Sequence, residues 1–270
     1  MPTSFEHDNR QLAETYDRVS GDRQFESGRR LVERLGLAEG AHVLDVGCGT
    51  GRLAQWIAER VGPSGSVAGI DPLPERIELA RSRGGAMRFE VGVAEDLSAF
   101  ADASFDAVCM SSVLHWLSDK AKALAEVHRV LRPGGRLGVT TMPHELTSAG
   151  TVARVMEPLL RSAPFAGHVD VSPMTFVTRG ATTTDLVRMV VDSRLELVEL
   201  HIVQRTMTYA SGADLVDFLE ASAFGNFLRI VPQELRPQFR AELAAAFDAQ
   251  RGPNGIVSRG WGVVFVAARV

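Results

Sequence analysis

The chain has 270 residues, of which 45% are hydrophobic, and this size suits one elaborated domain with a sizeable core better than two independent domains. Its formal net charge is -4 and its sequence pI is about 6.0. A mildly acidic surface argues against a nucleic-acid partner bound through its phosphates, so we expect none.

Nothing in the sequence indicates export or membrane attachment. Residues Met1–Leu12 are polar and charged and lack the apolar stretch of a signal peptide. The longest apolar run, Trp261–Ala268, is too short to span a bilayer. The two cysteines, Cys48 and Cys109, form neither a metal-ligand cluster nor a CxxC pair, which favours a reducing compartment. We therefore expect a cytoplasmic protein without a disulfide or a metal site.

As far as Thr141 the sequence alternates between short apolar runs and amphipathic segments. The first forty residues are expected to be helical and to end at Gly40, and Ser118 is expected to cap a later helix that Pro133-Gly134-Gly135 ends. The predicted strands are Val43–Val46, Val67–Ile70, Met87–Val91, Phe105–Met110 and Arg136–Thr141, and the predicted helices between them are Leu53–Val61, Pro74–Arg83 and Ser118–Leu131. This alternation predicts an α/β fold with a doubly wound, parallel sheet.

Beyond Thr141 the alternation loosens. Helices are expected at Val152–Arg161, at Thr183–Asp192 and twice within 211–250, and strands at Leu195–Gln204 and Trp261–Ala268. Leu235, Phe239, Leu243 and Phe247 recur every four residues and predict one apolar helix face.

The segment Asp45-Val46-Gly47-Cys48-Gly49-Thr50-Gly51 lies between a predicted strand and a predicted helix. A dinucleotide fingerprint would need a third glycine at Arg52, and no P-loop lysine follows. The carboxylate of Asp45 would repel a pyrophosphate but suits the ammonium and sulfonium cations of S-adenosylmethionine (SAM). The loop therefore favours a SAM site, with a tight strand–helix turn as the alternative.

Two further positions suit a nucleoside. Asp71 ends the second predicted strand, where a carboxylate can accept both ribose hydroxyls, although NAD would use the same acid and a helix N-terminal charge is the alternative. After the third strand, the backbone N–H of Ala94 is placed to meet the adenine ring. Glu95 and Asp96 are candidates to accept a hydrogen bond from the exocyclic amine of adenine, and the alternative is that they are acids at a helix start.

Five motifs in order resemble those of class I SAM-dependent methyltransferases, in particular the ubiquinone/menaquinone-biosynthesis-like group (methyltransferase type 11). They are Val43–Gly51, Gly69-Ile70-Asp71, Ala94-Glu95-Asp96-Leu97, Ser104–Val108 and Glu126–Gly135, and they cover about residues 40 to 141. The resemblance implies a seven-stranded Rossmann-like sheet whose last strand is antiparallel, with SAM as the cofactor. One departure is Val93, which stands where relatives often carry an acid that contacts adenine.

The resemblance also points to Tyr16, since relatives carry a Tyr-Asp pair on a helix that closes over the cofactor, with simple packing as the alternative. The expected cofactor-binding residues are Tyr16, Asp45, Gly47, Cys48, Gly49, Gly51, Asp71, Pro72, Ala94, Glu95 and Ser111. We interpret 1–270 as a single methyltransferase domain, with 1–40 as a helical lid, 41–142 as the SAM-binding core, and 143–180 plus 206–252 as helical cap insertions.

Methyl transfer needs alignment, exclusion of water and sometimes removal of a proton. His115 follows the fourth strand, where ligands of such sheets bind, and is the first candidate for a general base, with packing as the alternative. His144 is a second candidate and His201 is expected to be structural. Residues that could line a pocket, or only form a core, are Met174, Phe176, Met207, Tyr209, Phe218, Phe224 and Phe227.

These features predict SAM-dependent methyl transfer to an O, N or C nucleophile of a small, apolar or aromatic molecule. The alternatives are a SAM-binding protein without methyl transfer and an NAD-dependent Rossmann enzyme. A carrier-bound acceptor and the oligomeric state, monomer or homodimer, stay open.

Overall fold

The computed structural model describes residues 9–168 and 181–270. Two compact units divide the chain between them. The sheet unit consists of residues 21–142, 179–203 and 263–270, and the helical unit consists of residues 1–20, 143–178 and 204–262. Helix α1 and the two last strands contribute residues to both units.

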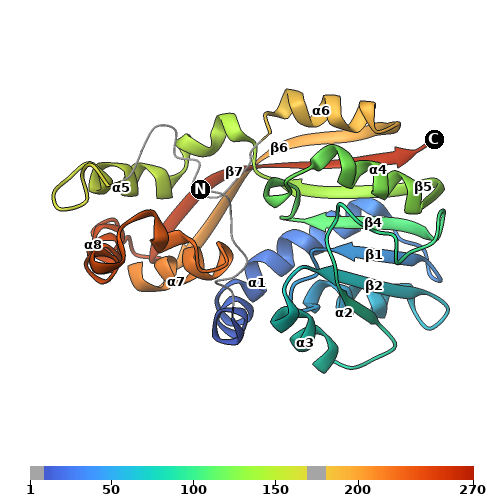
Figure 1. Cartoon of the computed structure of the whole chain (residues 1–270), viewed down its shortest axis with the longest axis horizontal. Coiled ribbons are helices and arrows are strands. Elements are labelled where there is room, and N and C mark those ends of the chain that lie inside the picture. The colour runs from blue at the N-terminus through green and yellow to red at the C-terminus, as the bar shows by residue number, and fades with distance from the viewer. Residues whose placement is uncertain (1–8, 169–180) are drawn as a thin grey trace. The chain divides into compact units, whose positions relative to one another are not determined.

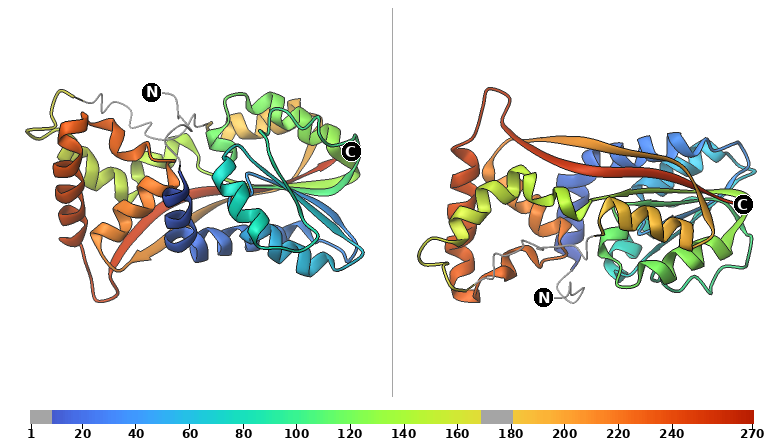
Figure 2. Two further views of the ribbon diagram at one scale, coloured as in Figure 1. Left: turned by 60° about the horizontal axis from the view of Figure 1, so that its bottom comes forward. Right: turned by 90° about the horizontal axis from the view of Figure 1, so that it is seen from above.

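A seven-stranded sheet organises the fold, with the strand order β3-β2-β1-β4-β5-β7-β6 (Figure 1). The strands are β1 (His42–Val46), β2 (Ser66–Asp71), β3 (Arg88–Val91), β4 (Phe105–Ser111), β5 (Leu131–Thr141), β6 (Leu195–Tyr209) and β7 (Ile256–Arg269). Strands β1 to β5 pair in parallel, whereas β7 runs antiparallel to β5, with Val139 opposite Phe265. The long strands β6 and β7 lie side by side (Figure 2). The predicted seven-stranded α/β fold with its antiparallel strand is confirmed.

Helices cover both faces of this sheet. The buried side chains of α1 (Arg10–Leu35), α2 (Arg52–Val61) and α3 (Pro74–Ser82) share one core with Val43 and Ala107. Those of α4 (Lys120–Val130) and α6 (Thr183–Asp192) share the other core with Leu44 and Val46. Successive strand residues point to opposite faces, so a strand buried on both sides needs apolar residues at nearly every position. This explains the short apolar runs of the sequence, and it makes Asp45 within β1 an exception.

Two element boundaries around α4 differ from the prediction. The helix is capped by Asp119, whose Oδ1 accepts a hydrogen bond from the Lys122 N–H at 2.9 Å, and not by Ser118. Strand β5 begins at Leu131 and not at Arg136, because the Pro133-Gly134-Gly135 segment lies within it as an irregularity. The register with β4 shifts there between Phe105 and Ala107.

Helix α1 and the last strands also have other bounds than expected. The helix ends at Leu35, before Gly36 with φ 64°, and Gly40 lies in a separate turn. Strand β6 continues past Gln204, and β7 begins before Trp261. Polar residues interrupt the apolar run of β6 on alternate positions, which hid its length in the sequence.

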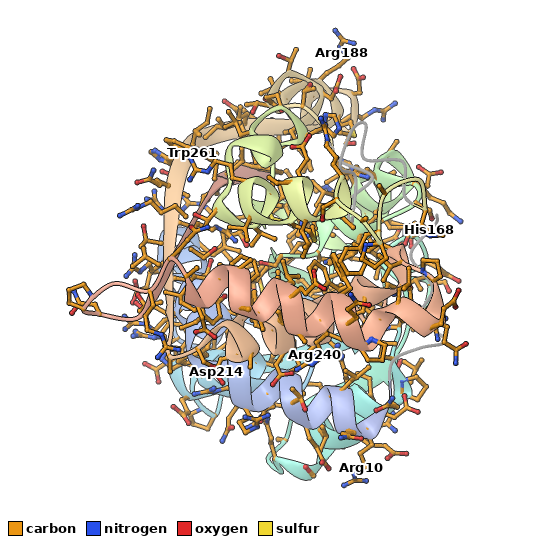
Figure 3. All side chains as sticks on the ribbon, turned by 90° about the vertical axis from the view of Figure 1, so that its left-hand side faces the viewer. Arg10, His168, Arg188, Asp214, Arg240 and Trp261 are labelled. Atoms are coloured by element: carbon orange, nitrogen blue, oxygen red, sulfur yellow. The ribbon has the colours of Figure 1, made fainter. Side chains whose placement is uncertain are left out.

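The helical unit packs around α5 (Thr151–Leu160), α7 (Gly212–Ser222) and α8 (Arg236–Asp248). The predicted apolar face of α8 is present, and the ring of Phe239 meets that of Phe165 edge-on at 5.1 Å. Arg240, labelled in Figure 3, lies on α8 and donates to Asp217 on α7 at 2.5 Å. No helix in the described ranges combines the length and the hydropathy needed to cross a bilayer.

Candidate functional site

The glycine loop joins the end of β1 to the start of α2 within the sheet unit. Gly47, Gly49 and Gly51 have φ angles of 70°, 54° and 78°, in the left-handed region that favours glycine. The N–H groups of Gly47 and Cys48 both donate to the carbonyl oxygen of Ile70, at 2.7 and 2.9 Å. The loop is therefore held against the end of β2.

Two of these glycines also leave no room for a side chain. A Cβ at Gly47 would lie 2.3 Å from Cγ2 of Val113, and one at Gly51 would lie 2.8 Å from Cβ of Ala80. Both distances are shorter than real Cβ contacts, so the fold requires glycine at both positions. The loop thus presents backbone rather than side chains at the carboxyl edge of the sheet, where ligands of doubly wound folds bind.

Asp45 is a buried acid with too few partners. Its side chain is 2% exposed. The thiol of Cys109 donates to its Oδ1 at 3.2 Å, while its Oδ2 is buried and has no hydrogen-bond partner in the structure. Burial raises the pKa of Asp45 to about 7, the bond from Cys109 acts to lower it, and the charge of Asp71 acts to raise it. Such a carboxylate would be stabilised by a cation, which is what the SAM prediction expects of it.

Asp71 ends β2, directly beside the loop. Its Oδ2 accepts from the N–H of Gly49 at 3.0 Å, and its Oδ1 accepts from the N–H of Leu73 at 3.1 Å. The side chain is 6% exposed. These two bonds orient the carboxylate of Asp71 beside the loop. Pro72 follows it and leads into α3. The structure therefore places three predicted cofactor residues, Asp45, Gly49 and Asp71, around one loop.

The predicted adenine segment follows β3 and is fastened to the start of α4. Ala94 is buried. Oε1 of Glu95 accepts from the N–H and the hydroxyl of Ser118, both at 3.0 Å, and from the N–H of Asp119 at 3.3 Å. Glu95 thus has a structural task that sequence reasoning missed, because its partners lie 23 and 24 residues away. The contact of Glu95 with the adenine amine stays a prediction.

Strands β4 and β5 end in a cluster of polar side chains. The hydroxyl of Ser111 lies 3.4 Å from that of Thr140, which also accepts from the Ser112 N–H at 3.0 Å. His115 follows in the short helix η1 (Leu114–Trp116), is 4% exposed, and has its Nδ1 3.2 Å from Oγ1 of Thr141. The two threonines were not predicted as site residues, although their place at a strand's carboxyl end was a usable signal.

Other predicted residues belong to the helical unit or have other partners. Tyr16 is half-buried on the part of α1 that belongs to the helical unit, and its role as a cofactor lid stays a prediction. His144 also belongs to the helical unit. His201 on β6 bonds to Glu199 at 3.1 Å, as a structural residue would. Among the described residues, no group of three or more His, Cys, Asp or Glu side chains could hold a metal ion.

The expected pocket residues of the later chain are largely buried. Tyr209 is 2% exposed, its hydroxyl donates to Sδ of Met207 at 3.5 Å, and its ring lies 5.6 Å from that of Phe218. Phe227 is 2% exposed. These contacts form a core within the helical unit, whereas Met174 and Phe176 lie outside the described residues.

Comparison with known proteins gives a family match and distant structural relatives. Residues 44–139 match the model of a methyltransferase domain, Methyltransf_11. The chain is 34% identical over 182 residues to the methyltransferase GfsG of Streptomyces halstedii, covering 63% of this chain and 64% of that protein. It is 40% identical over 115 residues to the ubiquinone/menaquinone biosynthesis C-methyltransferase UbiE of a Geobacter species, and this match covers 40% of this chain and 48% of that protein.

Both matched stretches thus span less than two thirds of the relatives' own length. Among solved structures, the YcgJ protein of Bacillus subtilis superposes with a TM-score of 0.60 at 20% identity, covering 90% of this chain and 98% of that one. At this identity the structural likeness supports the fold and not a function.

Proposed function

Because this chain belongs, through residues 44–139, to the class I SAM-dependent methyltransferases, we propose that it transfers a methyl group from SAM to an oxygen, nitrogen or carbon nucleophile of a small, apolar or aromatic molecule. The observation that carries the proposal is the buried Oδ2 of Asp45, which lacks a partner beside a backbone-lined loop. A buried acceptor of this kind is costly unless a ligand supplies the donor.

The residues around the loop fit this cofactor. When bound, SAM supplies a methyl group that its sulfonium has already activated. Asp45 would accept from the ammonium of the methionine moiety, Asp71 would accept from the ribose hydroxyls, and the Ala94 N–H would donate to the adenine ring. Gly47 and Gly51 would let the cofactor approach the backbone. Asp45 would disfavour a pyrophosphate, whereas Asp71 would suit the ribose of either SAM or NAD.

The protein's own part in the reaction is to position the acceptor, exclude water and, where needed, take a proton. His115 would accept that proton, and Thr141 would orient its ring through the contact with Nδ1. Ser111, which ends β4, would contact the cofactor or the acceptor. We assign acceptor specificity to the helical unit, because its helices lie within the segments that the core domain family does not cover.

The mild negative charge supports a small-molecule acceptor over a nucleic acid, and we propose that the protein works in the cytoplasm.

The test begins with cofactor binding, measured by calorimetry with SAM and with NAD as the control ligand. We expect SAM to bind, NAD not to bind, and Asp71→Ala to abolish SAM binding. Asp106→Ala is the matched control, because Asp106 also accepts from a backbone N–H, that of His42, at 2.7 Å. This bond lies at the starts of β4 and β1, whereas the glycine loop follows the end of β1. Binding of NAD instead of SAM would overturn the proposal.

Turnover is then followed with methyl-labelled SAM across a panel of phenols, amines and activated carbon acids. Labelled product from the wild type would support methyl transfer. If the His115→Gln variant binds SAM normally but turns over about a hundredfold more slowly, the transfer is assisted by a base. Tight SAM binding with no labelled product across the panel would favour the alternative of a SAM-binding protein without methyl transfer.

A further inference from the structure

Asp45 and Cys109 face each other across two neighbouring strands. Strands β1 and β4 pair in parallel, and Asp45 is the register partner of Cys109. Both side chains are nearly inaccessible, with Cys109 0% and Asp45 2% exposed. The Sγ of Cys109 lies 3.2 Å from Oδ1 of Asp45, and within the described part of the chain this is the one hydrogen bond that the carboxyl group makes.

The chemistry of the pair fixes the direction of this hydrogen bond. Burial raises the pKa of Cys109 well above its usual value, and the neighbouring Asp45 raises it further. The sulfur therefore stays a thiol and acts as the donor, while the carboxylate can only accept. The thiol bond leaves Oδ2 as the single open position of a buried acid.

Among the residues that the structure describes, the titratable groups that interact with Asp45 carry no positive charge. Asp71, from the end of β2, and Cys48, from the glycine loop, are the further titratable groups that interact with Asp45 or with its thiol partner. Asp71 is itself an acid, and burial raises the pKa of Cys48, which keeps that thiol neutral. The burial of Asp45 is thus compensated by Cys109 alone among these neighbours.

We propose that Cys109 is a positioning residue of the cofactor site, whose thiol holds Oδ1 of Asp45 so that Oδ2 faces the ammonium group of SAM. This inference rests on the proposed function. The thiol has two effects on the carboxyl group. It restricts rotation of the group, and it stabilises the charged form that binds a cation.

The pH dependence of SAM affinity distinguishes this role from simple packing. Burial raises the pKa of Asp45 to about 7, and the Cys109 bond opposes that rise. A cation binds the charged carboxylate better than the protonated acid, so affinity should fall as the pH drops through about 7. Removal of the thiol should move this fall to higher pH, whereas loss of packing alone should leave it in place.

The experiment is calorimetric titration of the full chain with SAM across acid to neutral pH, for wild type, Cys109→Ala, Cys109→Ser and Val108→Ala. Cys109→Ala should weaken SAM binding about tenfold near neutral pH and move the pH midpoint upward. Cys109→Ser keeps a hydrogen-bond donor and should restore both the SAM affinity and the pH midpoint of the wild type. Val108→Ala is the packing control, since Val108 is 0% exposed, neighbours Cys109 in β4 and belongs to the core on the other face.

The outcomes separate this inference from the proposed function. If wild type binds SAM but Cys109→Ala keeps its affinity and midpoint, the positioning role is wrong while the methyltransferase proposal stands. If Cys109→Ala and Val108→Ala both bind SAM more weakly and neither moves the pH midpoint of SAM affinity, the loss is a packing effect and the positioning role is wrong. If wild type binds no SAM at all, the proposed function itself fails.

Discussion

Asp45 is unfavourable for the folded chain, and on the proposed function it would bind the cofactor. Its carboxyl group is buried on a strand whose neighbours are apolar, and Oδ2 has no partner. The free energy of unfolding should therefore depend on its charge. Because its pKa in the folded chain, about 7, lies above its ordinary value of 3.8, its contribution to stability is full at low pH and is lost as the pH rises through about 7.

We predict that Asp45→Asn stabilises the protein without ligand at pH values above 7, by at most about 4 kcal/mol. The amide has nearly the same shape as the carboxylate, but it carries no charge that must be buried. The gain should shrink under acid conditions, where Asp45 itself is neutral. Urea unfolding at alkaline and acid pH measures both values. The same variant should lose SAM binding.

Asp106→Asn is the control for that prediction. Although burial acts to raise the pKa of Asp106, the bonds from the His42 N–H and from Arg132 lower it overall. Its substitution should therefore destabilise the protein at neutral pH. A stabilising Asp106→Asn, or an Asp45→Asn gain independent of pH, would contradict the electrostatic explanation.

At the scale of elements, the glycine loop is determined by contacts from three other segments. Strand β2 holds it through the carbonyl of Ile70, α3 approaches Gly51 through Ala80, and Val113 fills the space above Gly47. A left-handed φ explains why a residue with a Cβ is strained there. Steric contact explains why the strain cannot be relieved by small movements. The two effects can be separated by comparing glycines with similar φ angles.

Gly84 provides that comparison, because it has φ 73° against 70° for Gly47, and a Cβ added there would meet nothing within 4 Å. We predict that Gly84→Ala lowers the free energy of unfolding by about 1 kcal/mol and leaves SAM binding intact. Gly47→Ala should cost several times more and abolish SAM binding. Thermal unfolding and calorimetry check both. Equal costs would mean that φ strain alone explains the glycine at position 47.

At the scale of the whole molecule, the family match and the folded core have different extents. The matched residues end at 139, within β5. The core on the α4 and α6 face nevertheless includes Val263, Phe265 and Ala267 of β7, together with Leu186 and Val190 of α6. Strand β7 also pairs with β5 along six residues, from Arg136 to Thr141. The sheet unit therefore needs chain segments that lie far beyond the matched region.

A chain truncated after Met142 should accordingly fail to form a cooperative fold. Its strand β5 would be an unpaired edge, and the apolar residues that β7 covers would face water. We expect aggregation on gel filtration and loss of the near-ultraviolet circular dichroism of the full chain. A monomeric truncated chain that unfolds cooperatively and binds SAM would show that residues 143–270 serve only the acceptor.

Much of the sheet and its loop could be predicted from the sequence. Apolar runs placed β1, β2 and β4 within about a residue, because a strand covered on both faces leaves few positions for polar side chains. Asp45 indicated a cationic ligand, because a carboxylate disfavours a pyrophosphate. The glycines up to Gly51 indicated a tight loop, because left-handed turns favour glycine. The family motifs supplied the number of strands, the antiparallel last strand and the cofactor, which local patterns do not contain.

Only the tertiary structure decided which residues support one another. The thiol of Cys109 lies 64 residues from Asp45 in sequence, and Thr141 lies 26 residues from His115. Such pairings depend on strand order and register, which the periodicity of a single chain does not encode. The same is true of Glu95, a predicted adenine ligand, whose bond to Ser118 fastens the start of α4. Local chemistry determined what the loop can bind, and long-range pairing decided how its acid is held.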